Sequence, residues 1–170
     1  MQSPTPHGTK SLLIGNADIP IPELDMGEYS YISVFNRSRH PEYYPICTHH
    51  WMRAGIGNRY AADPDWLIHN GRVCILDHYT LNHGRLIYEK AKELGRSIRT
   101  MDARVIGDKH GYPKEKVPST GWIAVWWFLD FGIPVDIVGF TFEGVKAHNW
   151  EFEESNIKTL VETGRVCIKR

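Results

Sequence analysis

The chain has 170 residues, of which 42% are apolar and 24% are charged, values typical of one globular domain with a substantial core. Twenty basic residues balance twenty acidic ones, which argues against a partner held by bulk attraction, such as nucleic acid, while leaving room for a local basic patch. The three cysteines follow no CxxC spacing, so we expect neither a zinc site nor a disulfide framework, and a cytoplasmic location is the default. Residues 1–10 form a polar tail without signal-peptide character, and no apolar run reaches the ~20 residues that span a bilayer.

Strand-like and helix-like segments alternate along the chain. In order, the pattern predicts strands over 11–14 and 29–35, a loop-rich region over 40–70 with a short strand near 44–48, a strand over 73–77, a helix from 81 to 95, a strand over 103–107, a loop over 108–116, a helix from 119–121 to 132, a strand over 135–138, a helix over 153–163 and a strand over 165–168. This alternation predicts an α/β fold with a mostly parallel sheet flanked by helices. Right-handed crossovers would bring the turns after the strands, Gly15-Asn16, Asn36 and Gly139-Phe140, to the edge of the sheet where ligands usually bind.

Two turns could hold a phosphate or a nucleotide. Ser119-Thr120-Gly121 at a helix start offers unpaired N–H groups, two hydroxyls and the positive end of the helix dipole. An isolated turn of this kind is more often only a helix cap. Gly15-Asn16 after the first strand resembles a phosphate turn, or is an ordinary turn. It lacks the glycines of GxGxxG and the GKS/T ending of a P-loop, which argues against NAD and against ATP hydrolysis.

His148 follows a loop and precedes the helix in which Glu153 is expected. An imidazole near a helix N-terminus tends to stay neutral, which suits a general base. The ordinary alternative is a surface or packing histidine. Glu153 would favour the positive end of the helix whatever the function.

A metal site is not expected, although two groups of residues invite the idea. His49 and His50 are adjacent and would point to opposite sides of a strand, and no HxH or HExxH pattern is present. Asp63 and Asp65 flank Pro64 and match the DxD motif of some metal-dependent sugar transferases, a spacing that is frequent by chance.

The order of the motifs resembles that of the animal-type sialyltransferases. Pro118-Ser119-Thr120-Gly121 followed by Val138-Gly139-Phe140 is similar to the family's small motif, and His148-x4-Glu153 matches its very short motif. Leu13-Ile14-Gly15-Asn16 and Val34-Phe35-Asn36 resemble the two ends of its large motif.

The resemblance implies a single Rossmann-like glycosyltransferase domain over residues 11–170. It implies an inverting, metal-independent transfer of a sialic-acid-like sugar from a CMP-type donor to an acceptor hydroxyl, with the donor as substrate and no cofactor. His148 would be the general base and Glu153 a supporting residue. The implied nucleotide-binding residues are Gly15, Asn16, Asn36, Ser119, Thr120 and Gly121.

The chain departs from the family's motifs in two respects, and it is also much shorter than is usual in the family. The family's paired cysteines are absent, and residues 141–147 contain no counterpart of the histidine-tyrosine motif, whose histidine assists the departing phosphate in the family. His49, His50 and Tyr112 are the candidates to replace it.

Two other functions remain open, a non-catalytic nucleotide-binding module and a nucleotide or phosphate-ester hydrolase. The sequence also leaves open the identity of the sugar and of the acceptor, and whether the chain forms a homo-oligomer.

Overall fold

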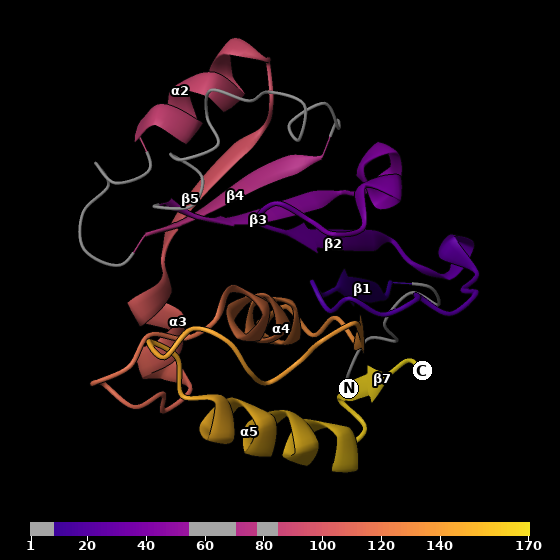
Figure 1. The fold of residues 1–170 in the computed structure, drawn as a ribbon, viewed down its shortest axis with the longest axis vertical. Coiled ribbons are helices and arrows are strands. Elements are labelled where there is room, and N and C mark those ends of the chain that lie inside the picture. Colours follow the sequence, from indigo (N-terminus) through magenta and orange to yellow (C-terminus); the bar gives the residue numbers. More distant parts are fainter. Residues whose placement is uncertain (1–8, 55–70, 78–84) are drawn as a thin grey trace, which may run out of the picture.

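Seven parallel strands form one sheet in the computed structural model, which describes residues 9–54, 71–77 and 85–170 (Figure 1). The strands are β1 (Ser11–Ile14), β2 (Tyr31–Phe35), β3 (His49–Arg53), β4 (Arg72–Asp77), β5 (Ile98–Asp102), β6 (Val135–Val138) and β7 (Val166–Ile168). The helices are α2 (Arg85–Glu93), α3 (Ala103–Lys109), α4 (Thr120–Asp130) and α5 (Trp150–Glu162), and two short 3-10 helices are η1 (Met26–Glu28) and η2 (Pro41–Ile46). Every strand pair among these residues is parallel, so the chain is a single α/β, Rossmann-like domain, as predicted.

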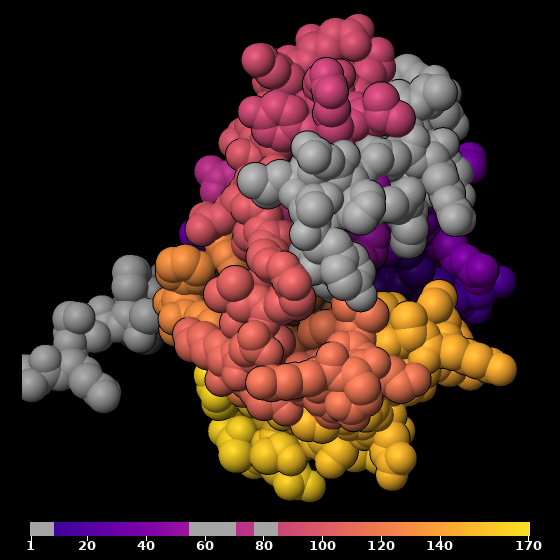
Figure 2. Space-filling model, turned by 90° about the vertical axis from the view of Figure 1, so that its left-hand side faces the viewer, coloured from indigo at the N-terminus to yellow at the C-terminus, as the bar shows by residue number. Residues whose placement is uncertain are grey.

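The domain has three layers. Helices α3, α4 and α5 cover one face of the sheet, and α2 lies on the other (Figure 1). Because successive side chains of a strand point to opposite faces, Trp51 of β3 packs in the core beneath α4, whereas Met52 packs with Ile87 of α2. Seen from the side, α3 and the loop after it lie between α2 and α5 (Figure 2). Helix α4 is apolar on most of its surface because it lies between the sheet and α5, where Trp122 donates to Asn156 at 2.9 Å.

The strand order, β5-β4-β3-β2-β1-β6-β7, reverses direction at β1. Ile14, the last residue of β1, pairs with Val34 of β2 on one side and with Val138 of β6 on the other. In open parallel sheets this switch point is where the loops after the strands separate and leave a crevice. The two strand ends approach so closely that a Cβ on Gly15 would lie 2.1 Å from the carbonyl oxygen of Gly139.

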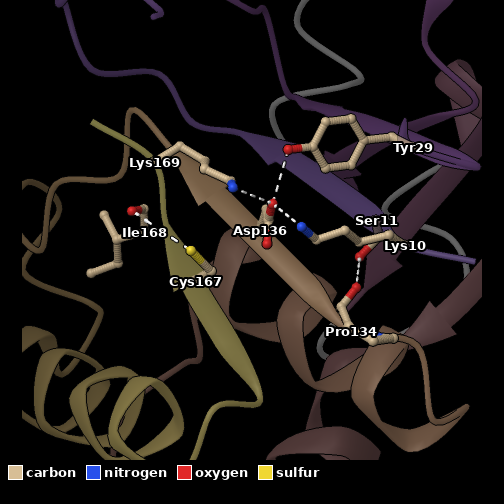
Figure 3. Close-up of polar contacts among 8 residues, drawn as sticks. All are labelled: Lys10, Ser11, Tyr29, Pro134, Asp136, Cys167, Ile168 and Lys169. Carbon is tan, nitrogen blue, oxygen red and sulfur yellow. Dashed lines mark hydrogen bonds and ion pairs between the residues drawn. The ribbon is translucent and has the colours of Figure 1, made fainter. Parts of the chain in front are cut away.

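A buried carboxylate in β6 connects this strand to the segments next to its two neighbours, β1 and β7 (Figure 3). Asp136, 1% exposed, accepts from the Tyr29 hydroxyl at 2.9 Å and pairs with Lys10 at 2.7 Å and Lys169 at 3.1 Å. Lys10 precedes β1 and Lys169 follows β7, so one carboxylate ties the strands on both sides of β6.

Most predicted elements are confirmed, but two predicted strands are wrong. Residues 44–48 hold the end of η2, and the strand lies later, at His49–Arg53. Thr48 ends the preceding turn, because its hydroxyl bonds both the N–H and the carbonyl of Ile32 at the start of the ladder. Residues 103–107 belong to α3, because Asp102 caps the N–H of Arg104 at 2.9 Å and so ends β5 and starts a helix.

One strand was not predicted: β5 (Ile98–Asp102) lies between the predicted helix end at Gly95 and the predicted strand over 103–107. The remaining differences concern boundaries. Helix α5 begins three residues before the predicted start, at Trp150, because the Asn149 side chain accepts from the N–H of Phe152 and caps it. Residues 1–8 of the predicted tail, Asp63-Pro64-Asp65 and the predicted helix start at Leu81 lie outside the described residues.

Candidate functional site

A cleft of about 480 Å³ lies at the carboxyl edge of the sheet, beside the switch point between β1 and β6. Its volume falls in the range of about 300–1,000 Å³ that is usual for small-molecule sites. The six predicted nucleotide-binding residues, the predicted base and its supporting residue all line this one cleft: Gly15, Asn16, Asn36, Ser119, Thr120, Gly121, His148 and Glu153. Segments more than 100 residues apart in the chain therefore meet where the parallel strands end.

Each of the two predicted asparagines uses its side-chain oxygen to hold a neighbouring segment. Asn16 accepts from the backbone N–H of Arg39 at 3.4 Å, and its amide donates to the carbonyl of Phe35 at 3.0 Å. Asn36 accepts from the backbone N–H of Arg53 at 3.0 Å, and its φ of 48° turns the chain sharply at the end of β2. Among the described residues, nothing accepts from the Nδ2 group of Asn36, which therefore remains available to a ligand.

The start of α4 presents unused donors to the cleft. Ser119 caps the helix, since its Oγ accepts from the N–H of Trp122 at 3.1 Å. The backbone N–H groups of Thr120 and Gly121 and the hydroxyl of Thr120 have no partner in the part of the chain that the structure describes. Gly121 is required sterically, because a Cβ there would lie 2.6 Å from the ring of Phe140. Unpaired N–H groups and the helix dipole make this end of α4 suitable for an anion.

His148 is held in one tautomer. Its Nδ1 lies 2.6 Å from the carbonyl oxygen of Val117, which can only accept, so Nδ1 carries the proton and Nε2 the lone pair. Nε2 has no partner among the described residues. Burial lowers the pKa of His148, the bond to Val117 opposes this effect, and the positive charge of Arg53 adds to it. The imidazole is therefore neutral near pH 7 and able to accept a proton.

Glu153 points away from the open part of the cleft and into its wall. Its carboxylate, 1% exposed, accepts from the N–H of Ser119 at 2.8 Å, from the hydroxyl of Ser119 at 2.5 Å and from the hydroxyl of Tyr112 at 2.8 Å. The Tyr112 oxygen in turn accepts from the N–H of Asn149, beside His148, at 2.9 Å. Burial raises the pKa of Glu153, and the bonds from Ser119 and Tyr112 oppose that shift. Glu153 thus connects the start of α4 to the start of α5.

The sequence did not point to three further residues of the cleft, Arg39, Arg53 and Trp150. Arg53 is the last residue of β3, and it was missed because the strand was predicted five residues too early. Trp150 packs edge-on against His148, with ring centroids 4.9 Å apart. Its indole N–H is buried without a hydrogen-bond partner among the described residues.

None of the three candidates for assisting a leaving phosphate lines the cleft. His49 stands at the opposite end of β3 and lines a separate cavity of about 710 Å³ at the amino edge of the sheet, where burial and two arginine charges lower its pKa to about 4. His50 is fully buried, and its Nε2 bonds the carbonyl oxygen of Asn36. Tyr112 is buried beneath the Ser119 turn.

Within residues 9–54, 71–77 and 85–170, no group of three or more histidine, cysteine, aspartate or glutamate side chains is placed to hold a metal ion. No helix in those ranges combines the length and the apolar character needed to cross a membrane. Comparison of the chain with protein-family models, with curated proteins and with solved structures found no match. The chemistry of the cleft is therefore inferred from its own residues.

Proposed function

We propose that this protein is a metal-independent, inverting glycosyltransferase that moves a sialic-acid-like sugar from a CMP-type donor to an acceptor hydroxyl. The observation that carries the proposal is His148: a neutral imidazole whose Nε2 is unpartnered among the described residues, in one cleft with the N-terminus of α4. The motif order that resembles the sialyltransferases supports the choice of a CMP donor.

In the proposed reaction the acceptor oxygen attacks the anomeric carbon on the face opposite the phosphate, so the configuration inverts. The acceptor proton passes to Nε2 of His148, and the electron pair of the breaking carbon–oxygen bond stays on the phosphate. The N–H groups of Thr120 and Gly121 are donors preorganised for the charge that develops there. A positioned general base contributes typically about 10²–10⁴-fold to the rate.

The first test is binding. We expect CMP and CMP-linked sugars, but not UDP, GDP or their sugars, to raise the melting temperature, because a ligand at about 100 times its dissociation constant stabilises the fold by about 2.7 kcal/mol.

The second test is turnover of a CMP-sugar, measured as CMP release and as acceptor product. His148→Ala should lose about 10²–10⁴-fold in kcat and retain its affinity for CMP. His110→Ala is the matched control, since His110 stacks on Trp126 and pairs with Asp130 outside the cleft. Full activity in His148→Ala would refute the assignment of the base. Binding of CMP without donor turnover would identify a non-catalytic nucleotide-binding module, and CMP release without an acceptor product would identify a hydrolase.

A cytoplasmic location is part of the same proposal. Cys47 and Cys74 are buried as free thiols, and burial raises the pKa of each to about 12. Unpaired buried thiols suit a reducing compartment. The partners proposed are the nucleotide sugar and its acceptor.

A further inference from the structure

The proposed transfer puts a second negative charge on the phosphate as it leaves. A carbon–oxygen bond forms to the acceptor, the bond from the sugar to the phosphate oxygen breaks, and a nucleoside monophosphate dianion is released. Electrostatic stabilisation of such a leaving group requires donors or cations that already face it. His49, His50 and Tyr112 do not line the cleft, so they do not supply this charge.

Two arginines do line the cleft, and no lysine does among the described residues. Arg39 stands at the mouth. Its backbone is fixed by the side chain of Asn16, as described above, whereas its guanidinium is 63% exposed and lies 3.9 Å from an almost fully exposed carboxylate of Asp18. An exposed ion pair at that distance contributes little, so the Arg39 guanidinium can turn to a bound anion at small cost.

Arg53 lies deeper in the cleft. Its backbone N–H is fixed by Asn36, and its guanidinium donates to the carbonyl oxygen of Pro118, the residue before the Ser119 cap. Burial lowers the pKa of Arg53 to about 10, and the charge of Glu153 opposes this shift, so the guanidinium is ionised near pH 7. Arg53 therefore holds a positive charge beside the N-terminus of α4.

Acidic groups restrict where an anion can bind. Glu143, an exposed carboxylate on the loop between β6 and α5, also lines the cleft and repels a phosphate. Glu153 also lines the cleft, but its buried carboxylate accepts from Ser119 and Tyr112 and acts on Arg53. The cationic side chains that line the cleft are those of Arg39, in the loop after β2, and Arg53, at the end of β3.

We propose that Arg39 and Arg53, each held at the cleft by one of the two asparagines, form the subsite for the donor's phosphate and stabilise it as it leaves. The inference rests on the proposed function for the identity of the ligand. It assigns the charge-neutralising role to one arginine in the loop after β2 and one at the end of β3.

Calorimetric titration of CMP and of cytidine separates the phosphate from the rest of the nucleotide. At low ionic strength we expect Arg39→Gln to weaken CMP binding by about 10- to 100-fold and to leave cytidine binding unchanged, the usual cost of losing a hydrogen bond to a charged group. Arg37→Gln removes the same charge from the same loop at a residue that does not line the cleft, and it should bind CMP as the unaltered protein does. Arg53→Lys keeps a positive charge opposite Glu153 but removes the planar fork, and we expect about a 10-fold loss of CMP affinity with cytidine affinity retained.

The outcomes separate this inference from the proposed function. CMP binding that is unchanged in Arg39→Gln and in Arg53→Lys overturns the subsite and leaves the nucleotide site intact. Equal affinities of the unaltered protein for CMP and cytidine also overturn the subsite alone. If neither CMP nor cytidine binds, the proposed function fails, and the inference fails with it.

Discussion

Replacement of Glu153 by glutamine tests whether this buried carboxylate holds the two helix starts of the cleft together. The carboxylate accepts three hydrogen bonds, two from Ser119 and one from Tyr112. A glutamine keeps one oxygen but places an NH₂ group where the second oxygen accepted the Ser119 hydroxyl. That hydroxyl already accepts from the N–H of Trp122, so its own hydrogen loses its acceptor.

The expected cost follows from those contacts. A hydrogen bond to a charged group contributes about 1.5–3 kcal/mol, and at least one is lost while the others become neutral. The Arg53 charge also loses the carboxylate that acts on it. Against this, glutamine avoids the desolvation that raises the pKa of Glu153. We therefore expect Glu153→Gln to lower the free energy of unfolding by about 2–3 kcal/mol.

Denaturant unfolding followed by tryptophan fluorescence, with linear extrapolation, measures this difference. Glu154→Gln is the matched control on the next residue of α5, where the side chain is 45% exposed and pairs with Lys158 at 3.0 Å, four residues on. That exposed pair is worth only about 0.3–0.5 kcal/mol. If Glu153→Gln were no more destabilising than Glu154→Gln, the carboxylate would not be what fixes the Ser119 turn.

Three further changes probe other parts of the fold. Burial lowers the pKa of His49 from 6.5 to about 4, so between those pH values the unfolded chain binds a proton that the folded chain does not. The free energy of unfolding therefore falls by roughly 3 kcal/mol as the pH drops from 6.5 to 4. His49→Gln should remove that loss when unfolding is measured at pH 7 and at pH 4. Gly121→Ala forces a Cβ against the ring of Phe140 and should cost about 1–3 kcal/mol by thermal unfolding, with part of the loss recovered in a double variant with Phe140→Ala. Asp136→Asn removes the charge that pairs with two lysines and should lower the free energy of unfolding by about 1–3 kcal/mol at low salt. The loss should be smaller in 1 M salt, because both lysines are partly exposed and salt screens their charges.

Each of these expectations has a contradicting result. A pH dependence identical in His49→Gln and the unaltered protein would mean that His49 titrates normally. Additive losses in the Gly121 and Phe140 double variant would mean that the two residues do not meet. A cost of Asp136→Asn that is the same at low and high salt would show that the lysine charges contribute nothing to it.

The sequence alone predicted the elements whose signals are local. Strand Val135–Val138 lies between a glycine-containing turn and Gly139, and Ser119 caps α4. Both features were predicted, because a strand pattern and a helix cap depend on residues only a few positions apart. The prediction failed where a local preference was overridden. The apolar pattern of residues 103–107 predicted a strand. The Asp102 cap and the packing of Ala103 and Ile106 into the core beneath α4 instead make these residues helical.

Which of the predicted site residues lie in one cleft depends on the assembled fold. Nothing in the local pattern places β6 beside β1, and that pairing brings Gly15, Asn36, Gly121 and His148 to one cleft. The tautomer of His148 likewise depends on a carbonyl 31 residues away. Local hydrogen bonding and side-chain periodicity specify the elements, and so the sequence determines them directly. The cleft depends on packing between segments far apart in the chain, and it therefore forms only when the sheet is assembled.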